Sequence, residues 1–120
     1  MAADSTQLIS LAPHFKEIEN RVSSAQFIEE IWLQLQRDAQ SCGLDFSGLK
    51  PKHVSDLIEG VKMFLSQLNP SQFHSLLYRV DVPENVLEKW VLIQETLDEW
   101  VTIILKREAL KVYFRYRFSH

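Results

Sequence analysis

Cysteine, glycine and proline are all scarce in this sequence, which has one Cys, three Gly and four Pro among 120 residues. So few glycines and prolines exclude a fold of many short strands joined by tight turns, and they favour long regular elements. The one thiol, Cys42, excludes an internal disulfide and is typical of a protein from a reducing compartment. Apolar runs also fall far short of the roughly 18 residues that identify a membrane span. These absences favour a helical protein without cross-links or membrane-spanning segments.

The overall composition is that of a globular domain, with 46% hydrophobic and 24% charged residues. A chain of this length buries about two-thirds of the surface that it exposes when unfolded, which is enough to fold without metals. We therefore expect one domain over residues 1–120 and no cofactor. Residues 1–12 lack the basic start and the long apolar stretch of a secretory signal, so we expect a cytoplasmic protein.

Capping and breaking residues divide the chain into helices. Ser23 followed by Gln26 resembles a capping box that opens a helix, and Asn69-Pro70 is a strong restart signal with Asn as the N-cap. Within residues 5–22, Pro13 either interrupts the first helix or marks its proper start, and the spacing of the apolar residues after it favours the second part. The sequence therefore predicts helices within residues 5–22, 23–42, 54–68 and 69–82.

The last segment is the most regular one, because residues 84–120 contain neither Gly nor Pro. The apolar residues follow the 4-3-4-3-4 spacing of a helix that packs nearly parallel to its neighbours. A helix from residue 83 to about 112 would be roughly 45 Å long at 1.5 Å per residue, which exceeds the expected width of so small a domain. The sequence predicts an all-α fold, a four- to five-helix bundle with a long C-terminal helix as its spine.

No set of side chains reaches the level of a catalytic or metal-binding motif. The four histidines are spread over different segments, and neither HxxxH nor HExxH spacing occurs. Glu95, Asp98 and Glu99 crowd three carboxylates together, but a solvated helix face explains them better than a general acid. We therefore predict no enzyme, with no catalytic, cofactor-binding or metal-ligating residues.

The charge is distributed unevenly along the chain. From Lys106 onward there are five basic residues and one acid, whereas the rest of the chain has 8 basic and 15 acidic residues. Residues 110–120 also interleave aromatic and basic side chains. This tail either projects toward a polyanion, an acidic partner or an anionic membrane surface, or folds back on the acidic body of its own domain. Packing on the bundle or self-association is the alternative that we favour.

The main functional prediction is a non-enzymatic protein-interaction or accessory domain. Its partner is either another protein or a second copy, bound as a homodimer through the broad apolar surface of the last helix. Aromatic and aliphatic anchors supply most of the affinity in such contacts. The expected anchors are Trp90, Trp100, Ile103, Leu110 and Phe114.

The alternative function is nucleic-acid binding through the basic and aromatic C-terminus. The net charge of −3 counts against it, since nucleic-acid-binding domains are typically basic. The expected contacts to a polyanion are Lys106, Arg107, Lys111, Arg115, Tyr116 and Arg117.

Two short strings carry a resemblance to other proteins. Leu76-Leu77-Tyr78-Arg79-Val80-Asp81-Val82 and Lys106-Arg107-Glu108-Ala109-Leu110-Lys111-Val112 resemble small uncharacterised all-helical proteins of bacteria. The resemblance covers about the C-terminal half of the chain. It implies a helical fold and carries no activity, because those proteins have none assigned.

Overall fold

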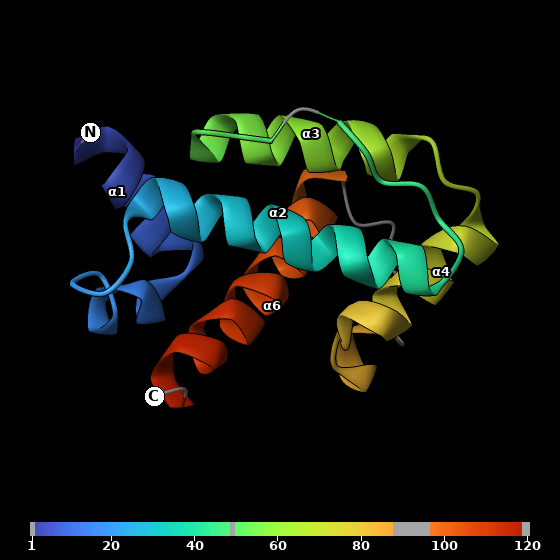
Figure 1. Ribbon diagram of the computed structural model, residues 1–120. Coiled ribbons are helices and arrows are strands. Elements are labelled where there is room, and N and C mark those ends of the chain that lie inside the picture. The colour runs from blue at the N-terminus through green and yellow to red at the C-terminus, as the bar shows by residue number, and fades with distance from the viewer. Residues whose placement is uncertain (1, 49, 88–96, 119–120) are drawn as a thin grey trace.

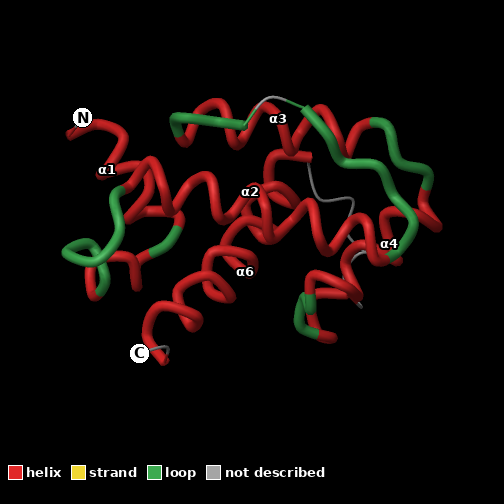
Figure 2. Tube along the Cα trace, in the orientation of Figure 1, coloured by secondary structure: helices red, strands yellow, loops and turns green. Residues whose placement is uncertain are grey.

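The computed structural model describes residues 2–48, 50–87 and 97–118, and within them every regular element is helical. Residues 84–87 are helical as well. The predicted all-α fold is therefore confirmed (Figures 1 and 2). The named helices are α1 (Ala2–Leu11), the 3-10 helix η1 (Pro13–Glu17), α2 (Ser24–Ser41), α3 (Val54–Ser66), α4 (Pro70–Val80) and α6 (Leu97–Phe118).

Helix α6 is the spine of the bundle. It passes behind α2 in Figure 1 and contacts α1, η1, α2, α3 and α4. The predicted helix from residue 83 to about 112 includes residues 88–96, which lie outside the described residues, as does Trp90. At its other end the helix continues past the predicted boundary, to Phe118.

Capping by side chains fixes where the helices begin and end. The Ser23 hydroxyl accepts a hydrogen bond from the Gln26 amide at 3.1 Å, which opens α2. Asn69 and Gln72 form a complete capping box at the start of α4, with both hydrogen bonds present. Asp81 closes α4 in the left-handed conformation, at φ 71°.

The first helical segment differs from the prediction in its backbone. Pro13 interrupts this segment, because α1 ends at Leu11 and only the short helix η1 follows. The regular α-helix therefore precedes Pro13, whereas the sequence favoured the part that follows it. Phe15, Ile18 and Val22 are nevertheless buried. Their spacing identified core residues correctly, although the turn that carries them is not an α-helix.

One hydrophobic core joins all the described helices. Its largest fully buried side chains include residues of α1, α2, α3, α4 and α6, and burying each such side chain contributes about 1.5–3 kcal/mol. They include Leu8, Phe27, Ile31, Leu35, Leu57, Leu65, Leu76, Leu77, Ile104 and Leu105.

An aromatic cluster fastens the loop after α2 to α3. The rings of Trp32 and Phe46 lie 4.3 Å apart, and those of Phe46 and Phe64 lie 4.5 Å apart. Gly60 of α3 leaves room for the Trp32 indole, since a Cβ at this position would lie 2.8 Å from a ring carbon. Glycine at position 60 is thus required for packing, although glycine lowers the stability of a helix interior.

Over the described part of the chain, no helix combines the length and the apolar character needed to cross a lipid bilayer.

Candidate interaction surface

The C-terminal half of α6 has apolar residues on two sides. One side packs inward and includes Ala109, Val112 and Tyr113. The other faces solvent, and its apolar residues Ile103, Leu110, Phe114 and Phe118 are called the α6 stripe below. This part of α6 thus has one apolar side in the core and a second, partly exposed apolar side outside it.

Phe114 and Phe118 are the most exposed members of the α6 stripe. Their side chains are 45% and 67% exposed, and their rings stack with centroids 5.8 Å apart. Among the described residues, Met63 and Tyr78 are the other large apolar side chains with comparable exposure. The two phenyl rings therefore form the one place in the described chain where large exposed apolar side chains stack together.

Two hollows flank the α6 stripe. A groove of about 220 Å³ separates α6 from residues 11–15, and its α6 wall is formed by Lys106, Ala109, Leu110 and Tyr113. A shallower hollow of about 510 Å³ lies on the other side, between Glu30 and the Phe114 and Phe118 rings. The stripe is thus a ridge beside two hollows, a shape that accepts side chains from an apposed helix.

Tyrosine hydroxyls fasten the tail to the body of the domain. Tyr113 donates a hydrogen bond to Glu17 at 3.0 Å, and Tyr116 donates one to Glu30. The Arg21 guanidinium donates to the Tyr116 carbonyl at 2.6 Å. Of the alternatives that the sequence left open, the structure shows the tail packed against its own domain as far as Tyr116.

The same contacts shift the ionisation of these groups. Burial, together with the hydrogen bond to Glu30, raises the pKa of Tyr116 to about 12. Burial and the bond to Glu17 also raise the pKa of Tyr113. The pKa of Glu17 is lowered, first by its hydrogen bond with His14 and then by that with Tyr113. Both tyrosines are therefore neutral hydrogen-bond donors at neutral pH.

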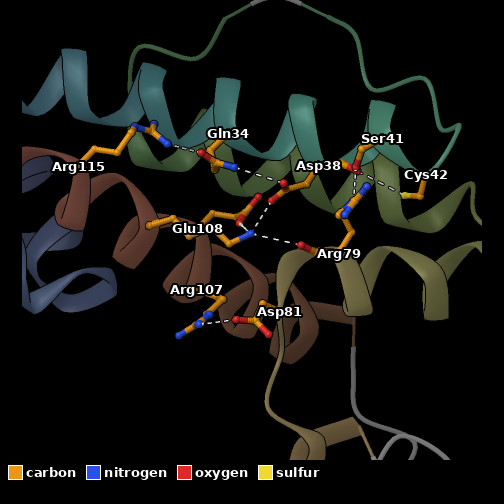
Figure 3. A network of polar contacts seen from close by, with 10 residues as sticks. Gln34, Asp38, Ser41, Cys42, Arg79, Asp81, Arg107, Glu108 and Arg115 are labelled. Carbon is orange, nitrogen blue, oxygen red and sulfur yellow. Dashed lines mark hydrogen bonds and ion pairs between the residues drawn. The ribbon is translucent and has the colours of Figure 1, made fainter.

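A buried polar cluster joins α6 to α2 and α4. The Lys111 ammonium lies 2.8 Å from an Asp38 carboxyl oxygen and 3.1 Å from Glu108 Oε1, and it donates to the Arg79 carbonyl at 3.3 Å. Figure 3 shows Asp38 of α2 and Glu108 of α6 pointing toward one another. One ammonium thus serves two carboxyl groups at the junction of three helices.

The second carboxyl group of this cluster is neutral. Glu108 is 0% exposed, and the ion pair between its Oε1 and the Lys111 ammonium at 3.1 Å lacks the geometry of a hydrogen bond. Burial and the adjacent Asp38 raise the pKa of Glu108 to about 9. Once protonated, Glu108 can donate to Asp38. Burial acts to raise the pKa of Asp38, but the bonds from Glu108 and Lys111 outweigh it, and that pKa is lowered.

This cluster joins three helices and is largely removed from solvent. Asp38 is only 8% exposed, and Glu108 has no exposed surface. In the described part of the chain, no group of three or more His, Cys, Asp or Glu side chains could hold a metal ion. The Lys111 ammonium holds α6 against α2 by its contacts with Asp38 and Glu108.

The structure separates the anchors that the sequence nominated. Trp100 lies in the core, with its ring 5.7 Å from that of Phe73, so it offers no surface to a partner. Ile103 and Leu110 are half-buried, and Phe114 is exposed. Phe118 was not among these anchors, although it follows Phe114 at the i+4 spacing that places both on one face.

The structure also divides the residues nominated for polyanion binding. Arg107 contacts Asp81 at 2.6 Å, Lys111 contacts Asp38, and Arg115 donates to Gln34. Lys106 and Arg117 are exposed on the side that carries the α6 stripe, and the Arg117 guanidinium also lies over the Phe118 ring, 5.6 Å from its centroid, and acts to lower the pKa of Tyr113. The domain itself therefore engages most of this set.

Comparison with known proteins gives no further guide, since no protein-family model, curated protein or solved structure matches this chain. The resemblance to small bacterial helical proteins stays a prediction.

Proposed function

We propose that this chain is a protein-interaction domain that self-associates through the α6 stripe. The observation that carries the proposal is the stacked, exposed pair of Phe114 and Phe118, which lines the hollow next to Glu30. Exposed aromatic side chains gathered on one patch are typical of protein-binding surfaces, because their burial supplies much of the affinity.

Charge favours a second copy as the partner. The C-terminal stretch from Lys106 is basic, whereas the rest of the chain has an excess of acidic residues. A second copy thus offers both an apolar stripe and acidic side chains to the exposed Lys106 and Arg117. The location that we propose is the cytoplasm, in keeping with a single cysteine.

Nucleic-acid binding receives less support. Arg107 and Lys111 are already paired with carboxylates of the same chain, so they would have to leave those partners to reach a phosphate. The Tyr116 hydroxyl donates a hydrogen bond to Glu30, and the side chain is only half exposed, so it is poorly placed to stack on a base.

Light scattering over a range of protein concentrations tests the proposal. We expect the mass to rise from the 14.0 kDa of one chain toward twice that value. Replacing both Phe114 and Phe118 with Ser should keep the protein monomeric, since both side chains are exposed and their loss leaves the core intact.

Met63→Ser is the matched control, because Met63 on α3 is 67% exposed, the same fraction as Phe118. It should associate like the unmodified chain. A protein that stays monomeric at every concentration would overturn the proposal, and so would a double variant that still dimerises.

A further inference from the structure

The solvent side of α6 carries charges of opposite sign at its two ends. Glu99 and Arg117 are both exposed and are separated by eighteen residues. Because an α-helix turns 100° per residue, eighteen residues make five full turns, and the two side chains point to the same side. They stand roughly 27 Å apart along the axis. Acid therefore marks one end of this face and base marks the other.

Three members of the α6 stripe (Ile103, Leu110 and Phe114) and the exposed Lys106 lie between these two charges, and Phe118 directly follows Arg117. The positions of Glu99, Ile103, Lys106 and Leu110 follow the 4-3-4 spacing of a helix-pairing seam. A parallel pair of such helices would place each charge beside its like. An antiparallel pair would place each charge beside its opposite, and it would also set the two helix dipoles against one another favourably.

Repulsion between cations at the centre of such a pair is already reduced inside each copy. The midpoint between Glu99 and Arg117 is residue 108. Close to it, Arg107 is paired with Asp81 at 2.6 Å and Lys111 with Asp38 at 2.8 Å (Figure 3 labels Arg107, Asp81 and Asp38). Lys106 keeps its charge at the edge, where its methylene stem can cover Leu110 of the second copy.

We propose that two copies of this chain pair through antiparallel α6 helices, with Glu99 of each copy facing Arg117 of the other. The pair has a two-fold axis close to residue 108, so each contact occurs twice, as in isologous dimers. The proposal rests on the self-association proposed above and adds its orientation and register. The apolar contact comes from the α6 stripe, and the charge pairs select the antiparallel arrangement.

Charge reversal tests the register. Glu99→Arg or Arg117→Glu alone should weaken the dimer about tenfold, because each places two like-charged pairs across the interface. The double variant restores opposite charges and should regain most of the affinity. Glu59→Arg is the control, since it makes the same change in charge at an exposed position of α3.

Disulfide trapping tests the orientation. In a Cys42→Ser background, which removes the native thiol, Glu99→Cys and Arg117→Cys chains are mixed and oxidised. We expect the mixture to form a disulfide between the two kinds of chain. Neither chain should form one alone, because like positions lie about 27 Å apart in the antiparallel pair.

The outcomes separate the two proposals. A monomeric protein overturns both. A dimer that is lost in the Phe114/Phe118 variant, but cross-links Arg117→Cys to itself, overturns only the antiparallel arrangement. The same holds for a dimer in which the double charge reversal gives no recovery.

Discussion

Glu108 and Lys111 stand one turn apart on α6, with 3.1 Å between Oε1 and Nζ, and Glu108 has no exposed surface. The ammonium also serves Asp38, whose carboxylate is the closer partner at 2.8 Å. Two carboxyl groups thus share one positive charge at the junction of α2, α4 and α6. The consequence is that one of the two is kept protonated, and this couples the fold to pH.

The first prediction concerns stability against pH. The pKa of Glu108 is about 9 in the folded protein against an ordinary value of 4.5, so between these values the folded state holds a proton that the unfolded state has lost. The contribution of Glu108 is therefore fully present below pH 4.5 and is lost as the pH rises to 9. The free energy of unfolding should fall by at most about 1.4 kcal/mol per pH unit in this window.

Urea unfolding at pH 5, 7 and 9 measures how the free energy of unfolding falls with pH. Glu108→Gln removes the titrating carboxyl group that causes this fall. The neutral amide should make the variant more stable than the unmodified protein at pH 9, and its stability should change less between pH 5 and 9. Glu59→Gln, at an exposed position, serves as the control. Equal slopes for the Glu108 variant and the unmodified chain would contradict the prediction. Asp38 does not interfere, because its lowered pKa moves its own loss of stability into acid.

Part of this architecture could be predicted from the sequence. Asn69 with Gln72 identified the start of α4, because a helix start depends on residues within one turn. Glu108 illustrates what local reasoning misses, since it stands in a run of charged residues and its partner Asp38 lies far away in the chain. A local signal did exist, because residue 108 lies on the same helix face as the buried Leu105 and Val112.

The same limit applies to the candidate surface. The spacing of apolar residues indicated that the last helix has a broad apolar surface. It did not show which of these apolar side chains are buried and which reach solvent. Trp100 and Phe114 are both among the predicted anchors, yet Trp100 is buried against Phe73 of α4, and Phe114 is exposed. Which aromatic side chain reaches solvent depends on the position of other helices, and that is a tertiary property.

Lys111→Met should destabilise the fold by roughly 3 kcal/mol, since it leaves Asp38 as a poorly solvated charge without its cation. The methionine fills a similar volume, so the loss reports the charge rather than a cavity. Lys52→Met, at an exposed position, should change the free energy of unfolding by less than about 0.5 kcal/mol. Denaturation at pH 7 compares the two variants. Equal free energies of unfolding for the two variants would show that the Lys111 cluster contributes nothing to stability.

Gly60→Ala should destabilise the protein although alanine is the better helix former by about 1 kcal/mol. The new Cβ would lie 2.8 Å from the buried Trp32 ring, and the indole is held between α3 and Phe46. We expect a net loss of about 1–2 kcal/mol, together with a change in tryptophan fluorescence. Ser55→Ala, at an exposed position of α3, is the control for propensity alone. A more stable Gly60 variant would refute the packing argument.

The last prediction uses the tyrosines as reporters of the packed tail. Tyr116, which is hydrogen-bonded to Glu30, should ionise with a pKa of about 12 in an alkaline absorbance titration. Tyr116→Phe should remove this late step from the titration. The raised pKa means that the stability contributed by Tyr116 is present below pH 10 and is lost as the pH approaches 12. If the tail projected into solvent instead, Tyr116 would titrate near the ordinary tyrosine pKa of about 10, and Tyr116→Phe would remove no later step.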